Sequence, residues 1–278
     1  MANITAQDIN KLRKMTGVGM MDCKQALTEA EGDFDKAIEI LRKKGQKVAS
    51  KRADRETSEG VAIARTTEDN TFGIAFVLTC ETDFVAKGDD FIQAANDIMD
   101  VAMSGRYTNM DELNAAKLMN QSQTVGELVN DLLSRIQEKI EVVSYVTLEA
   151  PYLTSYNHHN KKISTLVAFN KKIQGVEEAG KDVAMQIAAM APVALDENSV
   201  PANIIEKELE IARDLIRQEG KPEEMVEKIA QGKLNKFFKE STLMSQAFIK
   251  DGNMTVKAYV ESVDKDLQVT TFHRLTVS

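Results

Sequence analysis

Apolar residues occupy every second position from Phe72 to Cys80, which is the spacing of a β-strand with one buried face. A helical pattern begins only near residues 89–90. Asp83 and Phe84 are therefore expected in a turn, where the sheet has ended and no helix has begun. Most phenylalanines are buried, so composition favours a Phe84 that folds back into the core. The alternative is that both side chains project outward from the turn.

Residues 4–45 carry three amphipathic helical patterns, which predict a small bundle. The second and third patterns place apolar residues at offsets of 0, 3, 4 and 7, starting from Cys23 and Phe34. Gly45 is expected to end the third helix, because glycine is common just after a helix C-terminus. In the first helix, three apolar residues at helical spacing form the stripe that we expect to be buried: Ile9, Leu12 and Met15.

Met20 and Met21 begin the second helix of this bundle, directly after Gly19. Adjacent helical residues cannot share one face, so one methionine is expected to pack inward and the other to be exposed. An exposed methionine is an adaptable side chain for contact with a partner.

The stretch 43–55 is basic and carries no sustained apolar stripe. We favour a solvated linker between the bundle and the rest of the chain. The alternative interpretation is a contact with RNA or with an acidic partner surface.

The remainder of the chain mixes strand and helix patterns and predicts an α+β fold. We expect two α/β sandwich subdomains, each a mostly antiparallel sheet with a helical layer. The predicted divisions are a bundle and linker at 1–55, a first subdomain at 56–150 and a second at 151–278.

A helical hairpin is expected within the second subdomain, at about 200–240. Apolar residues recur there with heptad-like spacing on two segments, and Gly220 and Pro222 mark the turn between them. The pattern predicts an antiparallel coiled coil, and such a seam could also support a homodimer.

Charge and composition narrow the class of protein. The net charge is −8, and the excess of basic residues is confined to 1–55, so general nucleic-acid binding is not expected. Cys23 and Cys80 both lie in apolar patterns and are expected to be buried rather than paired. The first residues do not resemble a signal peptide, and no run approaches the ~18 apolar residues of a membrane span. We therefore expect a cytoplasmic protein.

Candidate catalytic chemistry is missing from the sequence. There is no phosphate-binding loop and no paired CxxC motif, and the adjacent His158 and His159 have the wrong spacing for a helical metal site. We expect no cofactor, no metal and no enzymatic activity, which suits a protein that acts by binding.

Two long motifs, LRKMTGVGMMDCKQALTEAEGD at 12–33 and TCETDFVAK at 79–87, resemble the elongation factor Ts family. The resemblance extends over essentially the whole chain. It implies a ubiquitin-associated type of bundle, a two-part core and a coiled coil. It also implies a guanine-nucleotide exchange factor, which binds elongation factor Tu with GDP, displaces Mg²⁺ and promotes GDP release so that GTP can rebind.

The same resemblance implies which residues contact the GTPase. It assigns the displacement of Mg²⁺ to a TDFV motif: Thr82, Asp83, Phe84 and Val85. It implies five further contacts: Arg13, Met20, Met21, Ile136 and His158. From its residues alone, His158 is equally well a surface-loop histidine. This chain departs from the family after Ile136, where a GEN-like sequence is replaced by Gln-Glu-Lys at 137–139.

The partner implied is elongation factor Tu, in a complex that could include a homodimer or a 2:2 assembly through the coiled coil. Neither a membrane nor direct nucleic-acid binding is expected. The competing function is a non-catalytic adaptor that holds a ubiquitin-like protein or RNA through the bundle and its basic linker. A thiol enzyme that uses Cys23 or Cys80 is a third, weaker interpretation.

Overall fold

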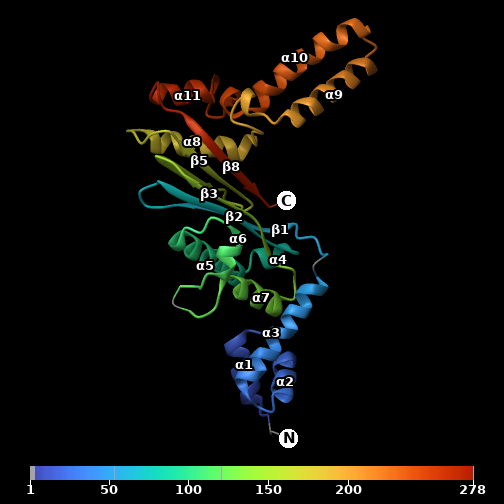
Figure 1. Cartoon of the computed structure of the whole chain (residues 1–278), viewed down its shortest axis with the longest axis vertical. Coiled ribbons are helices and arrows are strands. Elements are labelled where there is room, and N and C mark those ends of the chain that lie inside the picture. Colours follow the sequence, from blue (N-terminus) through green and yellow to red (C-terminus); the bar gives the residue numbers. More distant parts are fainter. Residues whose placement is uncertain (1–3, 53, 120, 278) are drawn as a thin grey trace.

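A computed structural model describes residues 4–52, 54–119 and 121–277 of the chain (Figure 1). A helical bundle lies at one end of the elongated molecule, a layered body of sheets and helices lies in the middle, and a helical hairpin projects from the other end (Figure 1). The α+β fold predicted from the sequence is confirmed, and the proposed divisions at residues 55 and 150 stay predictions.

The bundle consists of α1 (Ala6–Thr16), α2 (Met20–Glu29) and α3 (Phe34–Lys51). Thr5 and Asp8 form a capping box at the start of α1. The bundle core includes Leu12, Cys23, Leu27 and Ala37. Met15 was wrongly predicted to be buried: it is exposed at the last turn of α1 and lines a cavity between the bundle and helix α7 (Val125–Ile136).

Gly45 does not end α3, which continues to Lys51, so most of the predicted linker is helix. The glycine has a packing role instead. A Cβ placed on Gly45 would lie 1.6 Å from the Oγ atom of Ser134 on α7, so a larger residue would force the two helices apart. The bundle is therefore joined to the core by a helix that packs directly against α7.

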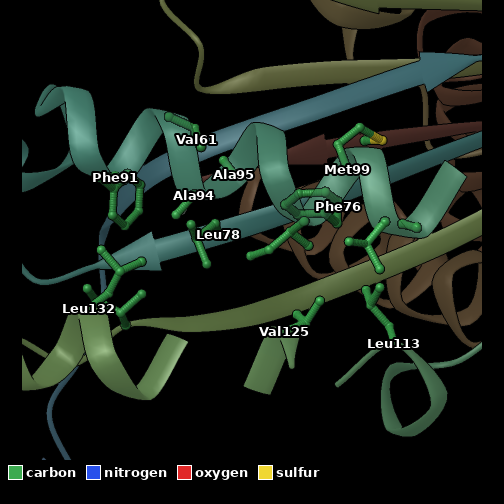
Figure 2. Packing of buried hydrophobic residues seen from close by; sticks show 14 of the residues in the cluster. Val61, Phe76, Leu78, Phe91, Ala94, Ala95, Met99, Leu113, Val125 and Leu132 are labelled. Atoms are coloured by element: carbon green, nitrogen blue, oxygen red, sulfur yellow. The ribbon is translucent and has the colours of Figure 1, made fainter. Parts of the chain in front are cut away.

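The first sheet contains β1 (Glu59–Thr66), β2 (Phe72–Cys80) and β3 (Glu141–Glu149), antiparallel and in the order β1-β2-β3. Helices α5 (Asp89–Gly105), α6 (Met110–Ala115) and α7 cover its outer face. Figure 2 shows this core, where side chains of β2 meet those of the covering helices: Phe76, Leu78, Phe91, Ala94, Leu113 and Leu132.

The second sheet contains β4 (Tyr152–Asn157), β5 (Ile163–Phe169) and β8 (Val269–Thr276), antiparallel and in the order β4-β5-β8. Helices α8 (Val176–Met190) and α11 (Val256–Val263) cover the face that points away from the first sheet. Buried side chains from both layers form its core: Val167, Phe169, Val183, Ile187, Val256 and Val260.

The two sheets pack face to face, so the core has four layers, with helices outside and sheets inside. The prediction that β2 buries only one face is wrong, because every residue of β2 is buried. Small side chains on the inner face permit this packing, among them Ala62 and Ala75. Gly73 is the extreme case, since a Cβ there would lie 2.8 Å from Cδ1 of Leu166.

The predicted hairpin is confirmed as α9 (Ala202–Gln218) and α10 (Glu223–Ser241). Short elements connect it to the second sheet: the 3-10 turns η1 (Glu197–Ser199) and η2 (Leu243–Ser245), and the strand pair β6 (Ala247–Phe248) and β7 (Asp251–Thr255). The two helices share a narrow apolar seam of Ala212, Ile216, Val226 and Ala230.

Candidate functional site

The chain leaves the sheet at Cys80 and enters helix α4 (Asp83–Ala86) almost at once. Thr82 has an extended backbone, and its Oγ1 accepts the N–H of Val85 at 3.4 Å, which caps the helix. The expectation that no helix begins before residues 89–90 is therefore wrong. One helical turn is inserted, because Thr82 supplies the acceptor that its first N–H groups need.

This single turn divides the side chains of the TDFV motif between the core and the surface. Val85 is buried in the core beneath the first sheet. Phe84 is 85% exposed. Successive helical residues point about 100° apart, and in this turn Phe84 faces solvent while Val85 and Ala86 face the core. The structure thus shows the projecting Phe84, and Val85 holds the turn from inside.

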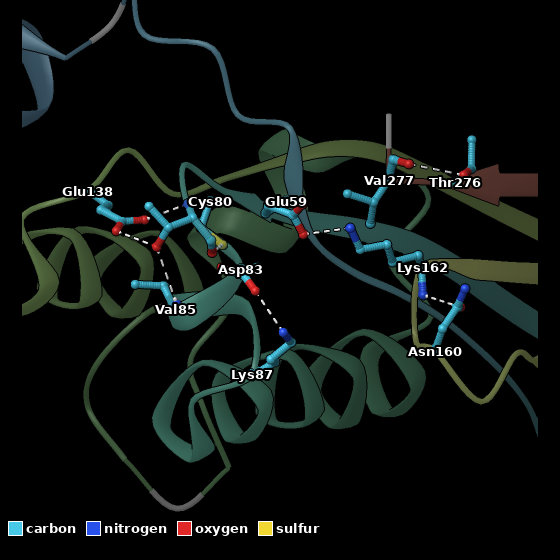
Figure 3. A network of polar contacts seen from close by, with 11 residues as sticks. Glu59, Cys80, Asp83, Val85, Lys87, Glu138, Asn160, Lys162, Thr276 and Val277 are labelled. Atoms are coloured by element: carbon cyan, nitrogen blue, oxygen red, sulfur yellow. Dashed lines mark hydrogen bonds and ion pairs between the residues drawn. The ribbon is translucent and has the colours of Figure 1, made fainter.

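Two carboxylates tie the motif to the loop that follows α7. Glu138 Oε2 accepts the backbone N–H groups of Glu81 at 3.1 Å and Thr82 at 3.0 Å. Its Oε1 accepts the Thr82 hydroxyl at 2.7 Å (Figure 3). In the opposite direction, Glu81 Oε1 accepts the N–H of Lys139 at 2.7 Å and Nη1 of Arg52 at 2.6 Å. Hydrogen bonds to ionised groups are roughly twice as strong as neutral ones. These bonds therefore fix the loop after β2 and the loop after α7 relative to each other.

Two ion pairs lie on or near the turn that carries Phe84. Lys87 Nζ donates to Asp83 Oδ2 at 2.7 Å, and Glu59 pairs with Lys162 at 2.6 Å close by (Figure 3). The hydrogen bond and positive charge of Lys87 lower the pKa of Asp83, while Asp83 raises the pKa of Lys87. Both groups are therefore charged at neutral pH, and Asp83 presents a carboxylate beside the exposed ring.

The structure places His158 at the same end of the core as the TDFV motif. His158 lies in the turn between β4 and β5, half-buried, with its Nδ1 2.8 Å from the Tyr156 hydroxyl. This turn is fixed to β1, because the Lys161 carbonyl accepts the N–H of Ala62 at 2.8 Å. The β1 residue Glu59 pairs in turn with Cys80, at the end of β2 from which the motif emerges.

Ile136 ends α7 and is half-buried against the core of the first sheet. It lies just before the departure from the GEN-like sequence. Gln137 there takes a left-handed conformation with φ 64°, which closes the helix, and Glu138 then reaches the motif. The side chain of Ile136 thus supports this loop from within.

Arg13, Met20 and Met21 lie on the bundle, and all three are exposed. The expectation that one methionine packs inward is wrong: Met20 is 43% exposed and Met21 is 77% exposed. The buried face of α2 is formed by Cys23, Ala26 and Leu27, and both methionines precede the first of these residues.

The turn between α1 and α2 packs against the C-terminal end of α7. Gly17 has φ 68°, and a Cβ there would lie 2.4 Å from Cδ of Arg135. Arg135 and Ile136 are the last two residues of α7, and Glu138 lies two residues after the end of this helix. The end of α7 therefore contacts both the bundle and the TDFV motif, and it connects the two groups of predicted partner contacts.

The residues that orient the motif were not predicted from the sequence. Glu81, Arg52 and Arg135 were not singled out, and Glu138 was noted only as part of a departure from the family pattern. The available signal was a charged residue close to the end of an element: Glu81 directly follows β2, and Glu138 is the second residue after α7. That signal does not reveal the partner, because the two glutamates are far apart in sequence.

Comparison with known proteins decides the family. The family model described as elongation factor TS matches residues 81–278. The elongation factor Ts of Christiangramia forsetii is 54% identical over 277 residues, which cover 100% of both chains. The chain belongs to the elongation factor Ts family. It is a translation elongation factor, and the recognition made from the two motifs is confirmed.

Other members of the elongation factor Ts family match over nearly the same length. The protein of Flavobacterium psychrophilum is 50% identical over 274 residues, which cover 99% of this chain and 98% of that protein. That of Cytophaga hutchinsonii is 46% identical over 279 residues and covers 100% of each. The family model begins at Glu81, so it includes the TDFV motif and Glu138, and these relatives also cover the bundle.

Burial makes both cysteines poor nucleophiles. It raises the pKa of the Cys80 thiol to about 12 and also raises the pKa of the Cys23 thiol. Both therefore remain protonated at neutral pH, whereas reactive cysteines have lowered pKa values.

Within residues 4–52, 54–119 and 121–277, no helix is long and apolar enough to cross a membrane. In the same residues, no group of three or more His, Cys, Asp or Glu is placed to hold a metal ion.

Proposed function

We propose that this elongation factor is the guanine-nucleotide exchange factor for elongation factor Tu. It binds the GTPase in its GDP state, displaces Mg²⁺ and promotes GDP release, so that GTP can rebind. The observation that carries the proposal is the ring of Phe84, which is 85% exposed on a short helix held by a cap, a buried valine and two carboxylates. A ring that is held in place before binding loses little conformational freedom on insertion into a partner.

The proposed mechanism needs no covalent step, no cofactor and no enzymatic activity of this chain. A protein that binds the nucleotide-free GTPase more tightly than the GDP form must weaken GDP binding by the same factor. Contacts to Mg²⁺ and phosphate dominate nucleotide binding in GTPases. Phe84 would wedge between helices of the nucleotide-binding domain and separate these contacts, with the Asp83 carboxylate beside it, while Thr82 and Val85 hold the turn.

The remaining residues form further contacts in this proposal. Met20, Met21 and Arg13 offer an exposed surface on the bundle, and His158 lies at the same end of the core as Phe84. Ile136 acts by supporting the loop that holds the motif. The protein works in the cytoplasm with the translation machinery and makes no direct contact with nucleic acid. The hairpin supports a homodimer or a 2:2 complex through the exposed apolar residues Ile211, Leu215 and Met225.

The test is the release of a fluorescent GDP from elongation factor Tu of the same organism, with and without this protein. The natural protein should accelerate release, and Phe84→Ala should remove most of the acceleration. Met190→Ala is the matched control, because Met190 is also an exposed apolar residue but lies at the end of α8. A natural protein that leaves the release rate unchanged would refute the proposal, and capture of RNA or a ubiquitin-like protein by the bundle would then favour the adaptor.

A further inference from the structure

We propose that Glu138, with Glu81 as its reciprocal partner, is the positioning residue that sets the direction of Phe84 for nucleotide exchange. The two glutamates and the loops they join, 81–82 and 138–139, are called the carboxylate clamp below. This inference rests on the proposed exchange function, and it adds a residue outside the TDFV motif whose charge controls how that motif works.

Helix α4 needs such support because it is a single turn of four residues. Isolated helices of this length are not stable, since nucleation costs more than one turn returns. Its own cap bond, from the Val85 N–H to Thr82 Oγ1, is long at 3.4 Å. The orientation of the turn must therefore come from contacts with other parts of the chain.

Glu138 supplies that contact at the point where the sheet has stopped guiding the chain. The last pair of β1 with β2 is Glu59 with Cys80. The next two N–H groups, of Glu81 and Thr82, both donate to one carboxylate oxygen of Glu138. The Thr82 hydroxyl donates to its other oxygen, so the group that caps α4 is itself held by Glu138.

Glu81 completes the clamp from the other side. Burial raises the pKa of Glu81, but hydrogen bonds from the Lys139 N–H and from Arg52 outweigh this and leave the pKa below its ordinary value. Glu81 is thus ionised at neutral pH and binds the loop that carries Glu138. Arg52 follows α3, so the clamp also reaches the segment that connects the bundle to the core.

The clamp and the core restrain different motions of α4. Val85 anchors the turn in the core of the first sheet, which prevents it from lifting off. Glu138 holds the N-terminal end from the flank, which prevents the turn from rocking about that anchor. Loss of Glu138 should therefore leave a folded protein in which the exposed ring of Phe84 no longer has one direction.

The first measurement uses stimulated GDP release from elongation factor Tu with Glu138→Gln, Phe84→Ala and the double variant. Glu138→Gln should lower the rate about tenfold, because loss of preset geometry slows a reaction without removing the reacting group. The double variant should be no slower than Phe84→Ala, because Glu138 acts through Phe84 and the two losses do not add. Glu149→Gln is the matched control: this exposed glutamate lies at the opposite end of β3 and should keep the full rate.

The second measurement reports on the free protein and does not depend on the GTPase. The chain contains no tryptophan, so Phe84→Trp introduces a single tryptophan at the site, which can be excited selectively at wavelengths that tyrosine does not absorb. Its anisotropy should fall when Glu138→Gln is added and stay unchanged with Glu149→Gln. Glu81→Gln, which removes only the reciprocal half of the clamp, should give a smaller fall and serves if Glu138→Gln does not fold.

The outcomes separate this inference from the proposed function. If the natural protein does not accelerate GDP release, the exchange function fails, whereas a fall in anisotropy would still support the clamp. If the natural protein is active, full activity of Glu138→Gln, additive losses in the double variant or an unchanged anisotropy would each overturn the inference.

Discussion

Phe76 and Phe84 are eight positions apart in one stretch of chain, and their surroundings are opposite. Phe76 is 0% exposed in the core of the first sheet, among residues of β2 and α5 (Figure 2). Phe84 is 85% exposed on α4. The same type of residue therefore contributes to folding at Phe76 in the strand and is available to a partner at Phe84 in the turn.

The difference between the two regions separates the residues that stabilise the fold from those assigned to the proposed exchange function. β2 is buried on both faces, so it is firmly held, and the turn that follows it begins from a fixed point. The turn adds little to the core beyond Val85 and Ala86. Substitutions in β2 should therefore change stability, and substitutions in α4 should change exchange.

The largest effect is expected from Phe76→Ala. Removal of a fully buried phenyl group typically costs about 3–5 kcal/mol of folding free energy, because a cavity remains. Chemical denaturation should show this loss, and below the unfolding transition the variant should still stimulate GDP release. A loss under ~1 kcal/mol would mean that β2 is not the rigid base assumed here.

Phe84→Ala should show the reverse pattern. Its free energy of unfolding should change by no more than ~0.5 kcal/mol, as for other surface substitutions. Stimulated GDP release should fall by at least about tenfold, equivalent to ~1.4 kcal/mol of lost stabilisation. Asp83→Asn keeps the shape and tests the charge. A strongly destabilised Phe84→Ala, or a stable one with full activity, would contradict the wedge.

Substitutions in the bundle test whether a second region, besides α4, contributes to nucleotide exchange. Substitution of both Met20 and Met21 by alanine should raise the concentration of this protein needed for half-maximal exchange several-fold, about 1 kcal/mol in affinity. The rate at saturation should stay the same, because these contacts serve binding rather than displacement of Mg²⁺. Met190→Ala is again the control, and a lowered saturating rate would assign the bundle a direct part in release.

Low pH should weaken the carboxylate clamp, with a smaller effect than that of the methionine substitutions in the bundle. The pKa of Glu81 is lowered by folding from the ordinary 4.5, so its carboxylate stabilises the fold fully above that value. This contribution is lost as the pH falls below 4.5 and through the folded pKa. Thermal unfolding between pH 7 and pH 3 should show a steeper loss for the natural protein than for Glu81→Gln, and parallel curves would exclude the contribution.

The smallest effect on exchange is expected from replacing the hairpin 203–238 with a short Gly/Ser turn. Its ends are already joined at the base, where the Val193 N–H donates to the Ser241 carbonyl at 2.9 Å. The rate of GDP release should change by less than twofold, while size measurements should show a smaller oligomer if the hairpin mediates a dimer. A loss as large as that of Phe84→Ala would place the hairpin in the exchange mechanism.

Local patterns in the sequence were sufficient for most of the long elements and for the family, although α4 was missed and the end of α3 was misplaced. The capping boxes at Thr5 and Thr124, the hairpin of β1 and β2 and the seam between α9 and α10 all follow from residues that lie close together in the chain. Helix caps, strand alternation and heptad spacing are short-range effects, so a single sequence reveals them.

Only the tertiary structure decided which of these residues meet. Gly45 looked like a helix end, and it is a contact point because α7 crosses it. Met15 looked buried, and it is exposed because the bundle core uses Leu12 and Val18 while Met15 lines the cavity that faces α7. The second buried face of β2 depends on the other sheet.

The direction of Phe84 is the clearest case of tertiary control. The TDFV motif identified the site, but the outward ring depends on Val85 filling the core and on Glu138 reaching Thr82 from 56 positions along the chain. Contacts between such distant residues leave no periodic signal in one sequence. The motif was therefore predictable, while the carboxylate clamp became visible only when the chain was folded.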